Sequence, residues 1–272
     1  MDDLAPREIA ETLTNKVSEY KFSNKLINIF ILGFLAGVYI AFGGLLSNLV
    51  AHDSAQYFGY GVSKLISGAV FSLALILVVI TGAELFTGNT LMVTAVLNKR
   101  ATTKELIKRW GIVFIANLLG AIFIVVLYYL SDSWKTHDLK TAINSITVAA
   151  AKTNLTFWVI FTRAIMANWL VCLAVYLAIA SKSILGKIIA IMIPVSAFVA
   201  LGFEHSIANM YFIPMGILLK GTEAAQNLGI DLSNLTLSGF INNLIPATLG
   251  NIIGGEFFVG VLYWFVYAKK NK

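Results

Sequence analysis

The sequence predicts an all-α membrane protein whose six transmembrane helices form an inverted 3+3 repeat, two halves of three helices each. Of its 272 residues, 58% are hydrophobic and only 12% are charged, whereas about a quarter of the residues of a soluble domain are charged. Apolar stretches long enough to cross a hydrocarbon core recur along the chain. Two of them are too long for one straight crossing and are polar at their centre, which suggests the two-half arrangement.

Residues 1–25 are expected to form a cytoplasmic N-terminal amphipathic helix. One apolar stripe recurs at helical spacing through this stretch: Ile9, Leu13, Val17, Tyr20. The stripe predicts a short helix over 6–21 that lies near the membrane surface. Because the stretch carries charges throughout and no apolar run, it is not expected to be a cleavable signal.

The apolar segments that follow define a transmembrane domain over 26–268, with a cytoplasmic tail over 269–272. The segments span roughly these residues: 26–50, 61–98, 110–131, 156–181, 186–219 and 239–268. An unbroken helix over the second segment would measure about 57 Å, and one over the fifth about 54 Å, against a hydrocarbon core of about 30 Å. Both helices are therefore expected to be broken.

The two breaks are placed at polar, glycine-containing stretches, TGAELFTGNT (81–90) and GFEHSIANM (202–210). Non-helical backbone survives at membrane depth only where protein or a watery cavity satisfies its polar groups. The broken segments are the second and fifth of six, and paired broken helices in inverted repeats mark a binding site near the membrane midplane. Both stretches carry the same three residue types at the same spacing: Gly82, Glu84, Asn89; Gly202, Glu204, Asn209.

Lysine and arginine counts orient the chain with both termini in the cytoplasm. Of 20 such residues, 14 lie on the cytoplasmic side in this topology, five lie on the other side, and Arg163 falls within a span. This asymmetry follows the positive-inside rule. It accounts for most of the net charge of +6, so no nucleic-acid partner is expected.

The residues that carry chemistry indicate a pore or a carrier rather than an enzyme. The three histidines are scattered, without metal-ligand spacing, and there is no phosphate-binding lysine loop. No catalytic residue, metal or cofactor is therefore expected. His205 stands out, because ionisable residues at membrane depth are functional by default. Two roles stay open: the imidazole hydrogen-bonds the backbone of the broken helix, or it faces the pathway and gives a proton to a small weak-acid anion.

Other residues near the breaks have expected roles as well. Glu84 and Glu204 are expected to tie down their loops. The half-helix N-termini present free N–H groups, and Thr87 and Ser206 add hydroxyls, which together attract an anion without a fixed charge. Large apolar side chains near the breaks either form dry constrictions or simply pack the helices: Phe71, Leu75, Leu85, Phe198, Phe203.

Three motifs resemble those of the formate/nitrite transporter family. VITGAELFTG (79–88) resembles its first signature, AIMANWLVCLA (164–174) its second, and GFEHSIANMYFIPMG (202–216) the fifth-helix motif of its formate channels. The resemblance implies an aquaporin-like six-helix protomer in the inner (plasma) membrane of a prokaryote, assembled as a homopentamer with one pore per protomer. It implies passage of small monovalent anions, formate first and otherwise nitrite or hydrosulfide, in a channel-like or proton-coupled manner.

The resemblance also implies roles for individual positions, and it makes the N-terminal helix a cytoplasmic gate. His205 would be the central pore histidine, Thr87 its hydrogen-bonding partner, and Asn168 an asparagine beside the pore. Leu75 and Leu85 would form a cytoplasmic constriction, and Phe71 and Phe198 a periplasmic one. Lys152 would be a vestibule lysine. A neutral-solute pore of aquaporin type is the alternative from another class. Six spans with two breaks suit it, but the sequence contains no paired NPA loops.

Overall fold

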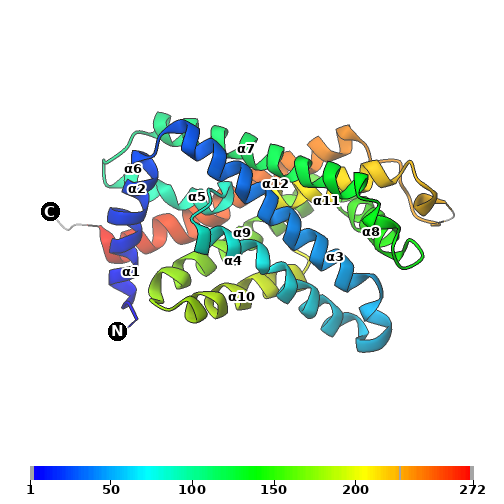
Figure 1. Ribbon diagram of the computed structural model, residues 1–272. Coiled ribbons are helices and arrows are strands. Elements are labelled where there is room, and N and C mark those ends of the chain that lie inside the picture. The colour runs from blue at the N-terminus through cyan, green and yellow to red at the C-terminus, as the bar shows by residue number, and fades with distance from the viewer. Residues whose placement is uncertain (1–2, 227, 270–272) are drawn as a thin grey trace.

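The computed structural model describes residues 3–226 and 228–269, so all of the expected tail except Lys269 lies outside the described residues. The described chain is helical and contains no strand, which confirms the all-α prediction, and it forms one elongated bundle (Figure 1). The α-helices are α1 (Pro6–Thr12), α2 (Ser18–Ser23), α3 (Leu26–Phe71), α4 (Leu73–Thr81), α5 (Phe86–Asn89), α6 (Val93–Leu97), α7 (Thr103–Leu130), α8 (Lys140–Thr153), α9 (Phe157–Ala180), α10 (Ile184–Ala200), α11 (Ser206–Leu219) and α12 (Leu237–Gly255). Short 3₁₀ or π-helical turns cover Leu13–Val17, Thr90–Met92, Ser133–Lys135, Glu223–Ala225, Glu256–Val261 and Trp264–Ala268.

The N-terminal segment, α1 to α2, packs its apolar stripe against the protein itself. Ile9 and Leu13 are buried in a cluster with Tyr176 of α9. The Tyr176 hydroxyl donates a hydrogen bond to the Pro6 carbonyl at 2.9 Å. Tyr20, the last residue of the stripe, is exposed. The stripe thus covers one end of the bundle, where the sequence had suggested a helix lying on the membrane surface.

Helix α3 extends well beyond the expected end of the first apolar segment near residue 50. Its backbone stays helical as far as Gly59, where it becomes non-helical (φ 72°, ψ 165°). Glycine adopts this left-handed φ without the steric penalty of a side chain. The chain reverses there at the far end of the bundle, opposite the N-terminus (Figure 1). A glycine turn therefore replaces the longer loop that composition suggested.

Two stretches of irregular backbone separate α4 from α5 and α10 from α11. A left-handed glycine follows the first helix of each pair, Gly82 with φ 75° and Gly202 with φ 70°. Such a glycine is a common helix terminator. The second helices begin at Phe86 and Ser206. The irregular residues, 82–85 and 201–205, lie at the N-terminal part of the two polar stretches, 81–90 and 202–210, where the breaks were expected.

Helix α8 occupies the stretch between the third and fourth apolar segments, where the sequence predicts no span. Its many polar residues keep it below the hydropathy of a membrane span. Its buried side includes Ala142, Ile146 and Ala149. Ala149 packs so closely on Gly216 of α11 that a Cβ at Gly216 would clash with it.

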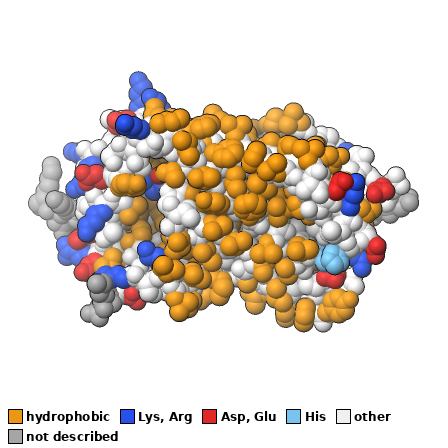
Figure 2. All heavy atoms as spheres, in the orientation of Figure 1, with side chains coloured by type: hydrophobic (Ala, Val, Ile, Leu, Met, Phe, Trp, Pro, Cys, Tyr) orange, Lys and Arg blue, Asp and Glu red, His pale blue; other side chains and the backbone are white. Residues whose placement is uncertain are grey.

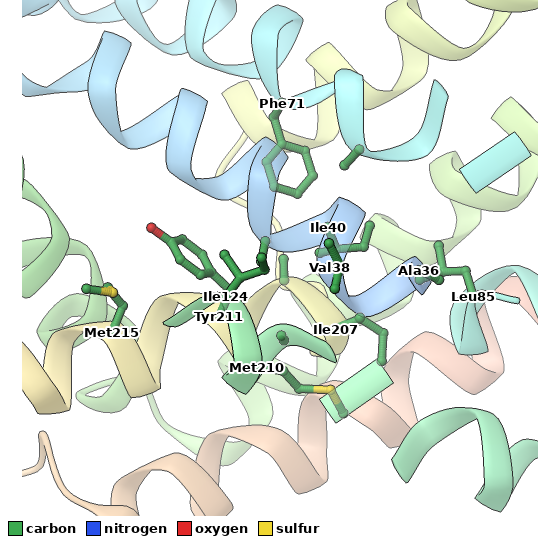
Figure 3. Packing of buried hydrophobic residues seen from close by; sticks show 14 of the residues in the cluster. Ala36, Val38, Ile40, Phe71, Leu85, Ile124, Ile207, Met210, Tyr211 and Met215 are labelled. Atoms are coloured by element: carbon green, nitrogen blue, oxygen red, sulfur yellow. The ribbon is translucent and has the colours of Figure 1, made fainter. Parts of the chain in front are cut away.

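Glycines bring two pairs of long helices into close contact, α3 with α7 and α9 with α12. A Cβ at Gly37 or Gly120 would collide with the backbone of the facing helix in the first pair. The same holds for Gly250 and Gly254 in the second pair. Small residues allow this approach in membranes, where packing and hydrogen bonds hold helices together. Between the pairs lies the apolar core, into which α11 projects Ile207, Met210 and Tyr211 (Figure 3).

The surface of the molecule is that of an integral membrane protein. Apolar side chains cover the middle of the visible face, while Lys, Arg, Asp and Glu gather toward its two ends (Figure 2). Four helical stretches of the described chain are long and apolar enough to cross a membrane: Leu26–Thr81, Thr103–Leu130, Phe157–Ala180 and Leu237–Ala268. An apolar middle between two charged ends is the distribution expected when the middle lies in the hydrocarbon core of a bilayer and the ends lie in water.

Candidate functional site

The loop between α4 and α5 is fastened by hydrogen bonds to its polar groups. The Glu84 carboxylate accepts from Lys21 Nζ at 2.7 Å and from Asn89 Nδ2 at 2.6 Å. Asn117 of α7 bridges the break itself. Its Nδ2 donates to the Glu84 carbonyl at 2.9 Å, while its Oδ1 accepts from the Phe86 N–H at 2.9 Å.

The loop between α10 and α11 repeats this arrangement with other residues. The Glu204 carboxylate accepts from Lys152 Nζ at 2.9 Å and from Asn209 Nδ2 at 2.7 Å. Asn251 of α12 donates to the Glu204 carbonyl at 3.0 Å and accepts from the Ser206 N–H at 2.8 Å. Each break therefore has one lysine, one glutamate and two asparagines in equivalent contacts.

These contacts explain how irregular backbone persists at the centre of the bundle. The end of one helix leaves carbonyls without partners, and the start of the next leaves N–H groups without partners. Asn117 and Asn251 satisfy one group of each kind at its break. The sequence analysis missed both asparagines and Lys21. Isolated asparagines in otherwise apolar helices were the available signal, while Lys21 was counted only as a topological charge.

His205 and Thr87 come from the two different breaks and meet at the centre. The His205 Nε2 and Thr87 Oγ1 atoms are 2.8 Å apart. His205 is also the N-cap of α11, since its Nδ1 accepts the Ala208 N–H at 3.1 Å. A neutral imidazole that accepts at Nδ1 carries its proton on Nε2. Nε2–H therefore donates to Thr87 Oγ1, and the Thr87 hydroxyl hydrogen is left free to point elsewhere.

Asn168 lies behind Thr87 and is fully buried. Its Nδ2 donates to the Thr87 carbonyl at 3.1 Å and to the Asn251 carbonyl at 2.6 Å. Cys172, one turn further along α9, lies 3.5 Å from the same Thr87 carbonyl. Asn168 thus holds the backbone that presents the Thr87 hydroxyl, and it lines none of the cavities described below.

Three cavities lie in a row through the bundle. The N-terminal cavity, of about 260 Å³, lies beside α2 and is lined by Tyr20, Lys21 and Glu84 among others. The distal cavity, of about 310 Å³, lies toward the Gly59 end and is lined by Lys152, Glu204 and His205 among others. A central cavity of about 10 Å³ lies between them, with room for roughly one water molecule.

Large apolar side chains line the boundaries between neighbouring cavities. Leu75 and Leu85 line both the N-terminal and the central cavity. Phe71 and Phe198 line both the central and the distal cavity, as does His205. The two phenyl rings meet edge to face, with centroids 5.9 Å apart. Phe198 also lies 5.9 Å from the His205 ring.

Both outer cavities contain more positive than negative charge. The N-terminal cavity contains Lys187 in addition to the Lys21–Glu84 ion pair. The distal cavity contains Lys64 and Arg163 in addition to the Lys152–Glu204 ion pair. Lys152 lines the distal cavity, and its charge is paired with the Glu204 carboxylate 2.9 Å away.

Comparison with known proteins identifies the family. Residues 7–265 match the model of the formate/nitrite transporter family. A probable formate transporter of Methanothermobacter thermautotrophicus is 46% identical over 272 residues, covering 93% of this chain and 94% of the relative. The formate channel FocA of Escherichia coli (strain K12) is 37% identical over 277 residues, covering 99% of this chain and 96% of the relative. A solved pentameric formate channel with formate bound superposes with a TM-score of 0.80 at 37% identity, covering 90% of this chain and 98% of that one. The chain belongs to the formate/nitrite transporter family.

Proposed function

We propose that this chain is a channel for formate and similar small monovalent anions, with one pore through each protomer. The carrying observation is the 2.8 Å contact between Thr87 and His205, the second of which lines both the distal and the central cavity. Relatives named for formate support formate as the first substrate. Nitrite is the second candidate, because the family description names it as well, and hydrosulfide has the same charge and a small size.

The row of cavities supplies the route. Leu75 and Leu85 form the cytoplasmic constriction in this proposal, and Phe71 and Phe198 form the periplasmic one. Apolar constrictions of this kind gate by excluding water. The N-terminal segment contributes Tyr20 to the lining of the N-terminal cavity, which supports its role as a cytoplasmic gate.

His205 and Thr87 supply hydrogen-bond donors between the two constrictions. A fixed positive charge at this depth would hold an anion too tightly, whereas conduction requires binding that is weak enough to release the ion. In the channel-like mode, the Thr87 hydroxyl and the Nε2–H of His205 donate hydrogen bonds to the passing anion. In the proton-coupled mode, the His205 ring first takes up a proton from the external solution, the resulting imidazolium gives its Nε2 proton to formate, and formic acid crosses while the ring returns to its neutral form.

The architecture that we propose is the inverted 3+3 repeat of six crossings, with the second and fifth helices broken, as in aquaporins. The equivalent bonds at Glu84 and Glu204 support it, since each half contributes one break with the same residue types. The lysine and arginine distribution supports cytoplasmic termini in a prokaryotic inner membrane. The similarity to a pentameric formate channel supports a homopentamer surrounded by lipid.

The proposed function is tested by formate flux into proteoliposomes that contain the purified chain. Wild-type protein is expected to pass formate, with a flux that rises as the external pH falls. His205→Phe is expected to lower the flux several-fold and to remove its pH dependence, whereas Lys140→Gln, on the exposed outer face, leaves both unchanged. Flux and pH dependence that are equal in His205→Phe and wild-type protein would contradict the role of His205.

A panel of permeants separates the candidate substrates. Planar-bilayer currents with formate, nitrite and hydrosulfide rank the anions. Stopped-flow swelling measures water and glycerol. Fast water or glycerol flux without anion current would replace this proposal with a neutral-solute pore.

A further inference from the structure

Two cations of the distal cavity have no carboxylate partner. Among the described residues, no carboxylate oxygen lies within 4 Å of the Lys64 ammonium or the Arg163 guanidinium. Lys152, the third cation of this cavity, is paired with Glu204 at 2.9 Å. The net positive charge of the cavity therefore comes from Lys64 and Arg163 rather than from the lysine that the family resemblance implied.

Arg163 lies inside a membrane-spanning helix, which makes its orientation informative. It is the seventh residue of α9, about 9 Å below the end of the helix at 1.5 Å per residue. A charge at such depth is costly in hydrocarbon and is found facing a water-filled cavity or a partner. Arg163 lines the distal cavity, which also contains His205. An anion that enters from this side thus meets Arg163 before the Phe71–Phe198 wall.

We propose that Arg163 forms a capture site for planar monoanions with two coplanar oxygens, such as carboxylates and nitrite, and that Lys64 adds charge to the same cavity. This inference rests on the proposed function, and it places a selective step at the mouth of the pore, ahead of His205. Arginine carries a rigid fork of N–H donors that matches both oxygens of a carboxylate. An ammonium is a compact point charge without that directionality.

The proposed capture site distinguishes anions by their shape and not only by their charge. Formate and nitrite present two oxygens to the fork, whereas chloride and hydrosulfide present a single atom. Lys64, 5.5 Å from the ring of Tyr60, raises the local concentration of every anion alike. Charged clefts with low-dielectric walls concentrate counter-ions in this way, and salt screens the effect.

Three variants of the full chain in planar bilayers test this site. Arg163→Gln removes both charge and fork, Arg163→Lys keeps the charge, and Lys140→Gln removes an exposed charge outside the cavity. Currents are recorded with formate or chloride on the outer side, at about 10 mM and about 1 M total salt, where the Debye length falls from about 30 Å to about 3 Å.

Arg163→Gln is expected to lower the inward formate current at low salt by about three- to tenfold, with the difference shrinking at high salt. Arg163→Lys is expected to keep the chloride current and to raise the formate concentration needed for half-maximal current. Equal losses for formate and chloride in Arg163→Lys would overturn the shape-selective site. So would an Arg163→Gln formate current equal to that of Lys140→Gln.

Controls keep the outcomes distinct. Size-exclusion profiles and thermal unfolding show whether each variant folds and assembles like the wild-type protein. If Arg163→Gln fails to assemble, the formate and chloride currents of Arg163→Lys, compared with those of the wild-type protein, still show whether selection depends on the charge or on the shape of the side chain. Absence of formate current in wild-type protein would instead refute the proposed function itself, before any variant is compared.

Discussion

At the residue scale, single asparagines hold the two irregular stretches of backbone in place. Asn117 and Asn251 each donate to a carbonyl and accept from an N–H across a helix break. Both are fully buried. A buried polar group that loses its partner costs its full desolvation free energy, whereas a satisfied network rigidifies its site. The positions of Thr87, just after the first break, and of His205, the last residue of the second, depend on these two side chains.

Replacing Asn251 with leucine is therefore expected to destabilise the protein strongly. The change leaves the Ser206 N–H and the Glu204 and Ala164 carbonyls without the partner that Asn251 provides. Each unsatisfied buried group costs about 1–3 kcal/mol. The apparent melting temperature in detergent, followed by circular dichroism, should fall markedly. Asn242→Leu on the exposed side of the same helix is the matched control, and equal melting temperatures for the two variants would contradict the bridging role.

Sequence reasoning reached some of these residues and missed others for a physical reason. His205, Glu84 and Glu204 were identified because charge or polarity within an apolar run is visible in a local window. Lys21 and Asn251 were not, because their partners lie 63 and 47 positions away along the chain. Such contacts depend on how helices pack, which spacing does not reveal.

Glycines define where the half-helices end at the element scale. Gly202 has a left-handed φ of 70°, and a Cβ built there would meet no atom within 4 Å. Substitution by alanine therefore creates no clash, and its cost is purely conformational, about 1–2 kcal/mol. Gly202→Ala is expected to lower the apparent melting temperature and to reduce formate flux, because the loop that carries His205 shifts.

Gly111 offers a matched control for this prediction. It lies within α7, has an ordinary helical φ, and an added Cβ would also meet nothing within 4 Å. Gly111→Ala is expected to be neutral or to stabilise the helix by about 0.5–1 kcal/mol. A Gly202→Ala variant as stable as Gly111→Ala would show that the left-handed backbone carries no cost.

The boundaries of some helices could be predicted from local hydropathy, and those of others could not. The spans over α7 and α9 follow from their apolar runs, and the structure places them within a few residues of expectation apart from the start of α7 at Thr103. Helix α8 was missed, because an amphipathic helix that packs on other helices lacks the hydropathy of a span. A connection was expected between residues 50 and 61, but its form was not, since one glycine in a helical pattern does not reveal that the backbone stays helical up to Gly59 and resumes directly after it.

At the scale of the whole molecule, the two irregular stretches have equivalent side-chain contacts and differ in the residue that precedes the second helix. Each break has the same lysine, glutamate and asparagine contacts. The residue directly before the second half-helix, however, is Leu85 in one break and His205 in the other. An apolar side chain and a hydrogen-bonding side chain therefore occupy equivalent N-cap positions, before α5 and before α11. In the proposed pathway, Leu85 belongs to one of the two apolar constrictions, and His205 lies between them.

Shortening the leucines between the N-terminal and central cavities tests their proposed role as a constriction. Leu75→Ala combined with Leu85→Ala shortens both side chains that separate the N-terminal cavity from the central one. Water should then occupy the gap, because an apolar constriction excludes water only while it is narrow. Formate current in planar bilayers is expected to rise several-fold, with discrimination between formate and chloride reduced and osmotic water flux increased. Leu73→Ala on the exposed side of α4 is the control. Unchanged current and water flux in the double variant would mean that the wall lies elsewhere.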